Sequence, residues 1–104
     1  MFKLIRDKYD EVIDPKLLFK IPKGDLDVIR YVDRKIDEEL LELRESDFKD
    51  INEYADVVEV LMKMAKENGI SEAEVNLARE AKNEKRGRFS NNLIFNYRNF
   101  KEKE

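Results

Sequence analysis

Cysteine and histidine are both absent from this chain of 104 residues. Without cysteine the chain can form neither a disulfide nor a thiolate metal site, and without histidine it has no imidazole base or ligand. Any metal ion held by side chains must therefore be bound through oxygen atoms. By the same reasoning, a general base must be a carboxylate, or a lysine or tyrosine with a shifted pKa.

Glycine, proline and long apolar runs are scarce as well. The chain has three glycines and two prolines, while 43% of its residues are charged and 41% are hydrophobic, a balance typical of long helices with solvated faces. No apolar run approaches the roughly 20 residues of a membrane span, and the charged first eight residues do not resemble a signal peptide. We therefore expect a cytoplasmic protein with no membrane partner. The net charge of −3 argues against nucleic acid as a partner.

Hydrophobic periodicity predicts an all-α fold with three long helices, over residues 25–44, 46–69 and 71–87. The first two should form an antiparallel helix hairpin, and flanking helices should complete a helical bundle together with oligomerisation. Residues 1–95 are expected to form the single domain, and residues 96–104 a charged C-terminal tail. The signals for helix ends are Asp25, Ser46 or Asp47, and the Ser71-x-x-Glu74 capping box at the starts, with Gly69 and Gly87 after the ends.

The second predicted helix is apolar around most of its circumference. Seven of the nine residues from Val57 to Ala65 are hydrophobic, and a helix of this kind must be covered on nearly all sides. Because a chain of this size buries only a modest core, we predict that this helix lies at a homo-oligomer interface, in a homodimer or a homotetramer. The alternative is cover within one chain by the tail and the opening segment, residues 1–14, which is compatible with a short strand or a helical turn.

Two acidic pairs lie on the neighbouring predicted helices. Glu39 and Glu42 on the first helix, like Glu53 and Asp56 on the second, have i,i+3 spacing, which places both carboxylates of a pair on one helix face. If the pairs face each other across the hairpin, they offer four hard oxygen ligands. Such ligands hold Mg²⁺ beside a substrate phosphate.

Acidic pairs also arise by chance in a chain with 24 acidic residues, and Lys35 or Arg44 could instead form ordinary salt bridges with these groups. Position favours the metal site, because Glu39 falls on the apolar stripe between Ile36 and Leu43. A carboxylate at the border of a core is costly unless it is paired or bound to a metal ion.

Three segments occur in a defined order along the chain: KLIRDK at residues 3–8, the acidic pairs within residues 35–42 and 53–60, and RGRF at residues 86–89. Together they resemble the all-α nucleoside triphosphate pyrophosphohydrolases, the superfamily of MazG-like proteins and phosphoribosyl-ATP pyrophosphohydrolase. Members of that group carry a KLVRDKIPEII opening, an ExxE…ExxD magnesium motif and an RGGF segment. This chain departs from the last segment by carrying Arg88 in place of the second glycine.

The resemblance implies a nucleoside triphosphate substrate that is hydrolysed to a monophosphate and pyrophosphate, with Mg²⁺ as the cofactor or Mn²⁺ in its place. A carboxylate that is not fully used in metal binding would take the proton from the attacking water, and the candidates are Glu38 and Glu39. The implied metal ligands are Glu39, Glu42, Glu53 and Asp56, and the implied phosphate-binding residues are Arg6, Lys8, Lys82 and Arg86.

Two other classes of function are open on sequence grounds. A non-enzymatic helical oligomerisation module would explain the apolar second helix, but not a carboxylate on the apolar stripe. A nucleotide-binding module, which would be a member of the superfamily that binds nucleotide without turnover, is the other non-enzymatic alternative. Nucleic-acid binding would use the basic and aromatic C-terminus, against the net acidity of the chain. Dependence on Mg²⁺ separates the enzyme from the first class, and salt-sensitive binding of an oligonucleotide would reveal the second.

Overall fold

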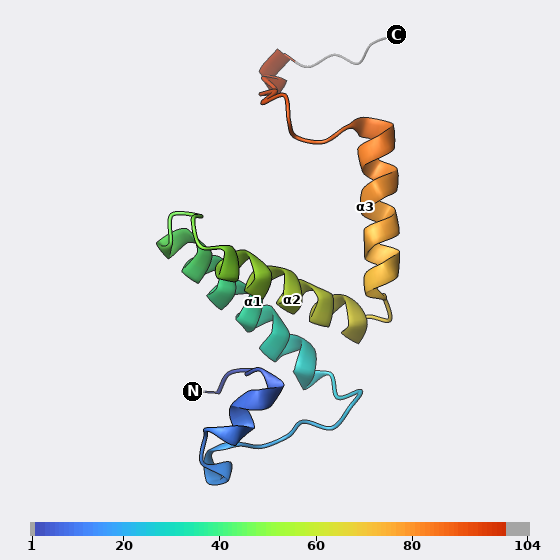
Figure 1. Cartoon of the computed structure of the whole chain (residues 1–104). Coiled ribbons are helices and arrows are strands. Elements are labelled where there is room, and N and C mark those ends of the chain that lie inside the picture. Colours follow the sequence, from blue (N-terminus) through green and yellow to red (C-terminus); the bar gives the residue numbers. More distant parts are fainter. Residues whose placement is uncertain (1, 100–104) are drawn as a thin grey trace.

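The computed structural model describes residues 2–99, and every regular element within that range is helical, which confirms the all-α prediction. The opening segment contains a 3-10 turn and not a strand. The predicted charged tail, residues 96–104, lies in large part outside the described residues. Among those described, no helix combines the length and the apolar character that a membrane span needs. In chain order the elements are η1 (Asp7–Glu11), η2 (Pro15–Leu17), α1 (Asp27–Glu45), α2 (Ile51–Glu67), α3 (Glu72–Arg86) and η3 (Tyr97–Asn99) (Figure 1).

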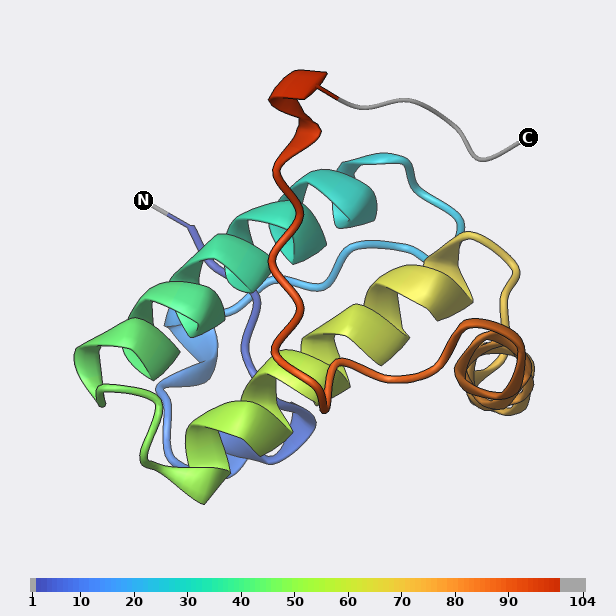
Figure 2. The same ribbon diagram turned by 90° about the horizontal axis from the view of Figure 1, so that it is seen from above.

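The two central helices, α1 and α2, form the predicted antiparallel hairpin. They lie side by side along most of their length in both ribbon views (Figures 1 and 2). Their apolar faces bury Val32 completely and leave 6% of Leu43 exposed. Among residues 2–99, no other hydrophobic side chain is buried to this degree. The core of the described chain is therefore small and belongs to the hairpin.

Two predicted helix starts differ from the observed ones. The helix α1 begins at Asp27, and the Asp25 carboxylate accepts a hydrogen bond from the Asp27 N–H at 2.9 Å. Ser46 does not start α2 but ends α1, because its hydroxyl donates to a carbonyl oxygen of the last turn at 2.7 Å. Asp47 and the next residue have φ of 55° and 61°, outside the extended region of a capping residue. The cap of α2 is Asp50, whose carboxylate accepts from a backbone N–H two residues later.

The turn from α2 into α3 forms as predicted. Gly69 has a φ of 76°, the left-handed conformation that ends a helix. The N–H groups of Gly69 and Ile70 donate to carbonyl oxygens of the last turn of α2 at 3.0 and 2.9 Å, the pattern of a Schellman motif. Ser71 and Glu74 then form the capping box of α3. These local hydrogen bonds fix the direction in which α3 leaves α2.

The helix α3 projects from the hairpin and does not pack along it. It meets α2 near its own first turn, and the chain beyond it continues outward (Figure 1). Seen from above, α3 is viewed almost along its axis, beside the end of α2 (Figure 2). The molecule is accordingly elongated, with extents of 63 × 32 × 25 Å.

Replacing Val32 with alanine should lower the free energy of unfolding by about 2 kcal/mol, because it removes two methyl groups from the centre of a small core. Urea denaturation followed by helical circular dichroism measures the effect. The matched control is Val12→Ala, whose side chain is 80% exposed and which should change stability by less than about 0.5 kcal/mol. Equal losses in the two variants would contradict a core placed between α1 and α2.

Candidate metal centre

The hairpin brings the four predicted metal ligands together. The helix α1 contributes Glu39 and Glu42, and α2 contributes Glu53 and Asp56, each pair about one turn apart. One carboxylate oxygen from each residue lies within 4.8 Å of the other three. The two acidic pairs therefore converge on one point, and we refer to these four residues as the acidic cluster.

Glu39 is the most deeply buried member of the acidic cluster, with 5% of the residue exposed. Its Oε1 atom pairs with the Lys35 ammonium group, one helical turn earlier, at 3.2 Å. Its Oε2 atom is buried and has no hydrogen-bond partner, and the same is true of Oε2 of Glu53. Buried carboxylate oxygens without a donor are costly. Two such atoms in one cluster are suited to accept a cation or a proton.

The opening segment is attached to the two central helices through two basic side chains. The Arg6 guanidinium donates a short hydrogen bond to Oδ1 of Asp56. Lys3 pairs with Glu38 at 3.2 Å, so the segment is attached to both α1 and α2. Arg6, which the resemblance implies as a phosphate-binding residue, therefore does lie at the acidic cluster.

The residues present fit a small, hard divalent cation. Four ionised carboxylates carry four negative charges, and Lys35 and Arg6 supply two positive ones. A divalent ion would balance the two charges that remain. An ion that holds oxygen at about 2.1 Å places ligands on its opposite sides about 4.2 Å apart. The observed spacing of up to 4.8 Å is within a small side-chain movement of that arrangement.

Two carboxyl groups of the acidic cluster have a raised pKa. For Glu39 the main cause is burial, which outweighs the hydrogen bond from Lys35, and the charges of Glu42 and Asp56 raise the pKa further. For Glu53 desolvation is again the first cause, followed by the charge of Asp56, and a hydrogen bond with Glu42 offsets part of the rise. In the absence of a cation, these two groups hold protons more readily than free carboxyl groups.

Glu38, the other candidate base, has a pKa shifted in the opposite direction. Partial burial raises its pKa, but hydrogen bonds from Lys35 and Lys3 outweigh burial and keep the pKa below the ordinary value. The pKa of Lys35 is raised. Burial on its own lowers this pKa, but the hydrogen bonds of Lys35 to Glu38 and Glu39 have the larger effect. At neutral pH, Glu38 is therefore an ionised carboxylate beside the acidic cluster and engaged by two lysines.

The other predicted phosphate-binding residues are spread along the chain. Lys8 is exposed on η1, within the segment that Arg6 attaches to α2. Lys82 and Arg86 lie in the second half of α3, which points away from the hairpin (Figure 1). Within one chain, the structure brings Arg6 to the acidic cluster but does not bring Lys82 or Arg86 there.

The sequence does not predict the contact between Lys3 and Glu38, and it predicts the Lys35 salt bridge only as an alternative to a metal ion. Lys3 holds Glu38 although 35 residues separate them, and no local pattern predicts such a contact. From the sequence, Lys35 is expected to form an ordinary salt bridge in place of a metal ion. It does pair with Glu39, yet it satisfies one oxygen and leaves the other without a partner.

Comparison of the chain with protein-family models, with curated proteins and with solved structures finds no match. The chemistry open to the site therefore follows from its own geometry. Four converging carboxylates, two of which carry a buried oxygen without a partner, can take up a cation or protons.

The effect of Glu39→Gln on the stability of the metal-free protein should depend on pH. Because the pKa of Glu39 is raised above its ordinary value of 4.5, the folded state binds this proton more tightly than the unfolded state. Ionisation of Glu39 therefore lowers the free energy of unfolding as the pH rises from 4.5 through the raised pKa. Above this window Glu39→Gln should be more stable than the wild type, and below it the advantage should disappear.

Urea denaturation in excess chelator, repeated from acidic to neutral pH, measures this difference. Glu45→Gln is the matched control, because Glu45 is exposed on the same helix and should follow the wild type at every pH. A gap between Glu39→Gln and the wild type that does not change with pH would contradict the buried-carboxylate assignment.

Proposed function

We propose that this protein is a nucleoside triphosphate pyrophosphohydrolase of the MazG-like all-α superfamily and that it requires Mg²⁺, for which Mn²⁺ can substitute. Its substrate is an NTP or a dNTP. Water attacks the α-phosphorus, the bond to the oxygen that bridges the α- and β-phosphorus breaks, and a nucleoside monophosphate and pyrophosphate leave. A cytoplasmic location and a homo-oligomeric state belong to the same proposal.

The observation that carries this proposal is the buried oxygen of Glu39 that has no partner within the acidic cluster. A structural ion-pair network gives no reason to leave that atom unsatisfied, because unpaired buried polar atoms destabilise a fold. When bound, Mg²⁺ neutralises phosphate charge and lowers the pKa of a bound water. The three motif segments, which occur in the order of the superfamily, are the second support.

The chain's own residues have distinct roles in this reaction. The acidic cluster holds the ion. Glu38 is a candidate for the general base because it lies outside the four converging carboxylates, and it must release Lys3 or Lys35, which donate to its two oxygens, to accept a proton. Glu39 would serve as the base only if it were released from the ion. Arg6 neutralises charge on the phosphates by exchanging Asp56 for a phosphate oxygen, and Lys8 assists from η1.

Pyrophosphate release from a panel of ribo- and deoxynucleoside triphosphates tests this function. Mg²⁺ should support turnover, excess chelator should abolish it, and Mn²⁺ should restore it. Glu39→Gln and Glu53→Gln should each lower kcat/KM at least about 100-fold, because each removes one charged ligand. Glu45→Gln, which changes an exposed carboxylate of α1, should alter kcat/KM less than about 2-fold.

The same experiment distinguishes the alternatives. A folded protein that binds Mg²⁺ and triphosphate without turnover would be a nucleotide-binding module, and the hydrolase proposal would be wrong. A protein that binds neither would leave only an oligomerisation module. Turnover that persists in chelator, or in both variants of the acidic cluster, would contradict the role of the metal centre.

Replacing Arg6 should strengthen the binding of Mg²⁺ and weaken the binding of the triphosphate. Arg6→Ala frees Asp56 from its ion pair, so Mg²⁺ should bind about 2- to 5-fold more tightly, because a solvent-exposed pair contributes at most about 1 kcal/mol. The KM for triphosphate should rise, because the same side chain no longer reaches the phosphates. Arg30→Ala breaks an exposed Arg30–Asp27 pair on α1 and should change neither quantity. Calorimetry gives the Mg²⁺ affinity, and a fall in that affinity for Arg6→Ala would contradict the exchange.

A further inference from the structure

The single chain exposes far more surface than a compact protein of its mass. Its accessible surface is 10164 Å² for a mass of 12.4 kDa, whereas a compact monomer of this mass exposes about 6,100 Å². Its radius of gyration is 18.4 Å, against about 13 Å for a compact chain of this length. The excess of about 4,000 Å² is large enough to form an obligate interface, which buries about 2,000 to 5,000 Å² in total.

Part of this surface is an apolar stripe on α2 whose side chains stay about half or more exposed in the described chain. Ile51 is 79% exposed, Tyr54 48%, Val58 50% and Leu61 45%. Their spacing of three, four and three residues is that of the seam by which two helices pack together. We call these four residues the outer stripe.

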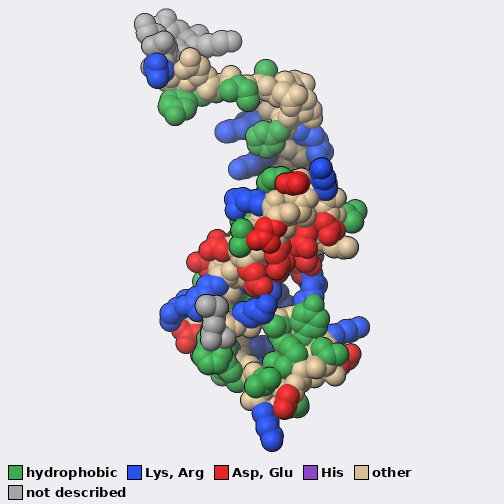
Figure 3. Space-filling view, turned by 90° about the vertical axis from the view of Figure 1, so that its left-hand side faces the viewer, with side chains coloured by type: hydrophobic (Ala, Val, Ile, Leu, Met, Phe, Trp, Pro, Cys, Tyr) green, Lys and Arg blue, Asp and Glu red, His purple; other side chains and the backbone are tan. Residues whose placement is uncertain are grey.

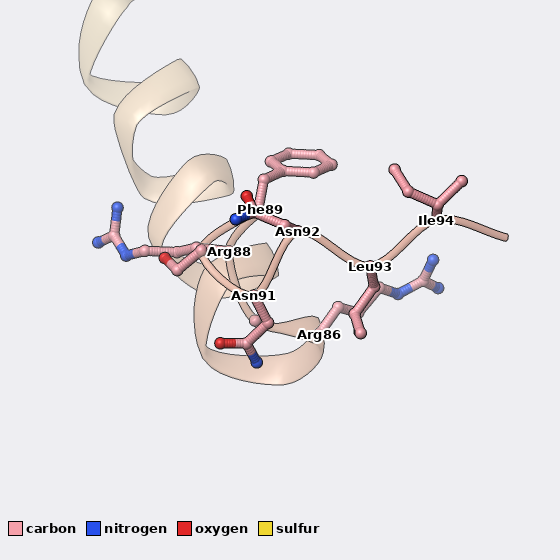
Figure 4. Close-up of a pocket in the computed structure, with 9 residues that line it drawn as sticks. Arg86, Arg88, Phe89, Asn91, Asn92, Leu93 and Ile94 are labelled. Atoms are coloured by element: carbon pink, nitrogen blue, oxygen red, sulfur yellow. The ribbon is translucent and has the colours of Figure 1, made fainter.

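A second exposed apolar surface lies on the chain from Ser71 to Asn99, which we call the arm. Leu77 is 66% exposed on α3, and beyond the helix Phe89, Leu93 and Ile94 are 101%, 87% and 94% exposed. Figure 4 shows Phe89 and Ile94 projecting to the same side of the loop that follows α3. Side chains of this size are costly to leave in water on an ordered segment.

The arm cannot easily cover the outer stripe of its own chain. The Schellman motif and the capping box allow only two residues between the C′ position of α2 and the first residue of α3, and they fix the angle between the two helices. With that angle α3 points away from the hairpin (Figure 1). A second copy of the chain is free of this constraint.

Opposite net charges favour packing of the arm of one copy against the hairpin of another copy. Residues 27–67 carry thirteen acidic and seven basic residues, a net charge of −6, whereas the arm, residues 71–99, carries six basic and four acidic residues, a net charge of +2. The positive charge of the arm is concentrated in its outer part, residues 82–98, which carries five basic residues and one acidic residue. Figure 3 shows acidic side chains gathered over the middle of the molecule and basic side chains on the part above. Pairing two outer stripes directly would instead bring two acidic hairpins together.

We infer that two copies of this chain exchange their arms, so that the arm of each copy lies along the outer stripe of α2 in the other. The arrangement is two-fold symmetric and closed, because each copy gives one arm and receives one. It covers both apolar surfaces at once and brings opposite charges together. It deepens the homo-oligomeric state of the proposed function and rests on that part of it. It involves no member of the acidic cluster, so failure of arm exchange and failure of the hydrolase activity are distinguishable.

Sedimentation equilibrium of the full chain should give about twice the monomer mass of 12.4 kDa. Leu61→Lys on the outer stripe and Leu93→Lys on the arm should each weaken the dimer at least about 10-fold, because a buried charge replaces an apolar contact. Leu93 lies outside the helices, so its variant tests the interface without a change in the hairpin. Val12→Lys, at an exposed residue of the opening segment, is the control and should leave the mass unchanged.

The pairing itself can be mapped because the chain has no native cysteine. Leu61→Cys in one preparation is mixed with Leu77→Cys or Leu93→Cys in another and treated with a short bismaleimide. Cross-links between the two variants should exceed those within each preparation at least about 10-fold, as expected for one specific pairing. Dominant Leu61→Cys self-cross-links, or a monomeric wild type, would overturn arm exchange. A monomer that binds single-stranded oligonucleotide with steep salt dependence would assign the arm to nucleic acid instead.

Discussion

The burial of the Glu39 carboxylate between α1 and α2 is the constraint on which the rest of the site depends. The residue lies on the apolar stripe of α1, so the packing that buries Val32 and Leu43 also buries this charge. Lys35 satisfies one of its oxygens and leaves the other without a partner. The fold thus carries an electrostatic cost at its centre that protonation or a bound cation would remove.

Basic side chains already offset part of this cost in the absence of an ion. Arg6 engages Asp56, and Lys3 engages Glu38, so two ion pairs hold the opening segment against the hairpin. The Phe2 and Phe19 rings add an edge-to-face contact at 5.2 Å between that segment and the chain that follows it. Because Arg6 and a cation would share Asp56, the attachment of this segment and occupation of the acidic cluster are linked energetically.

The parts of the structure that could be predicted from the sequence are those set by local chemistry. Gly69 and the capping box at Ser71 act within a few residues, and periodicity alone placed Glu39 on the buried stripe. The start of α2 could not be predicted in this way. Ser46 and Asp47 are good capping residues, but the backbone after α1 makes a left-handed turn that delays α2 until Asp50 caps it. Contacts between distant segments, such as that of Lys3, leave no local pattern.

The composition of α2 follows from two separate demands on one helix. At 100° per residue, the face that carries Glu53, Asp56 and Val60 and the outer stripe that carries Val58 and Leu61 are centred about 140° apart. The first face must contact α1 to assemble the acidic cluster, and the second needs a partner that the chain does not itself supply. An ordinary surface helix has only one apolar stripe. Because α2 has two, its hydrophobic content reflects both the metal centre and assembly, and substitutions on either face should perturb one without the other.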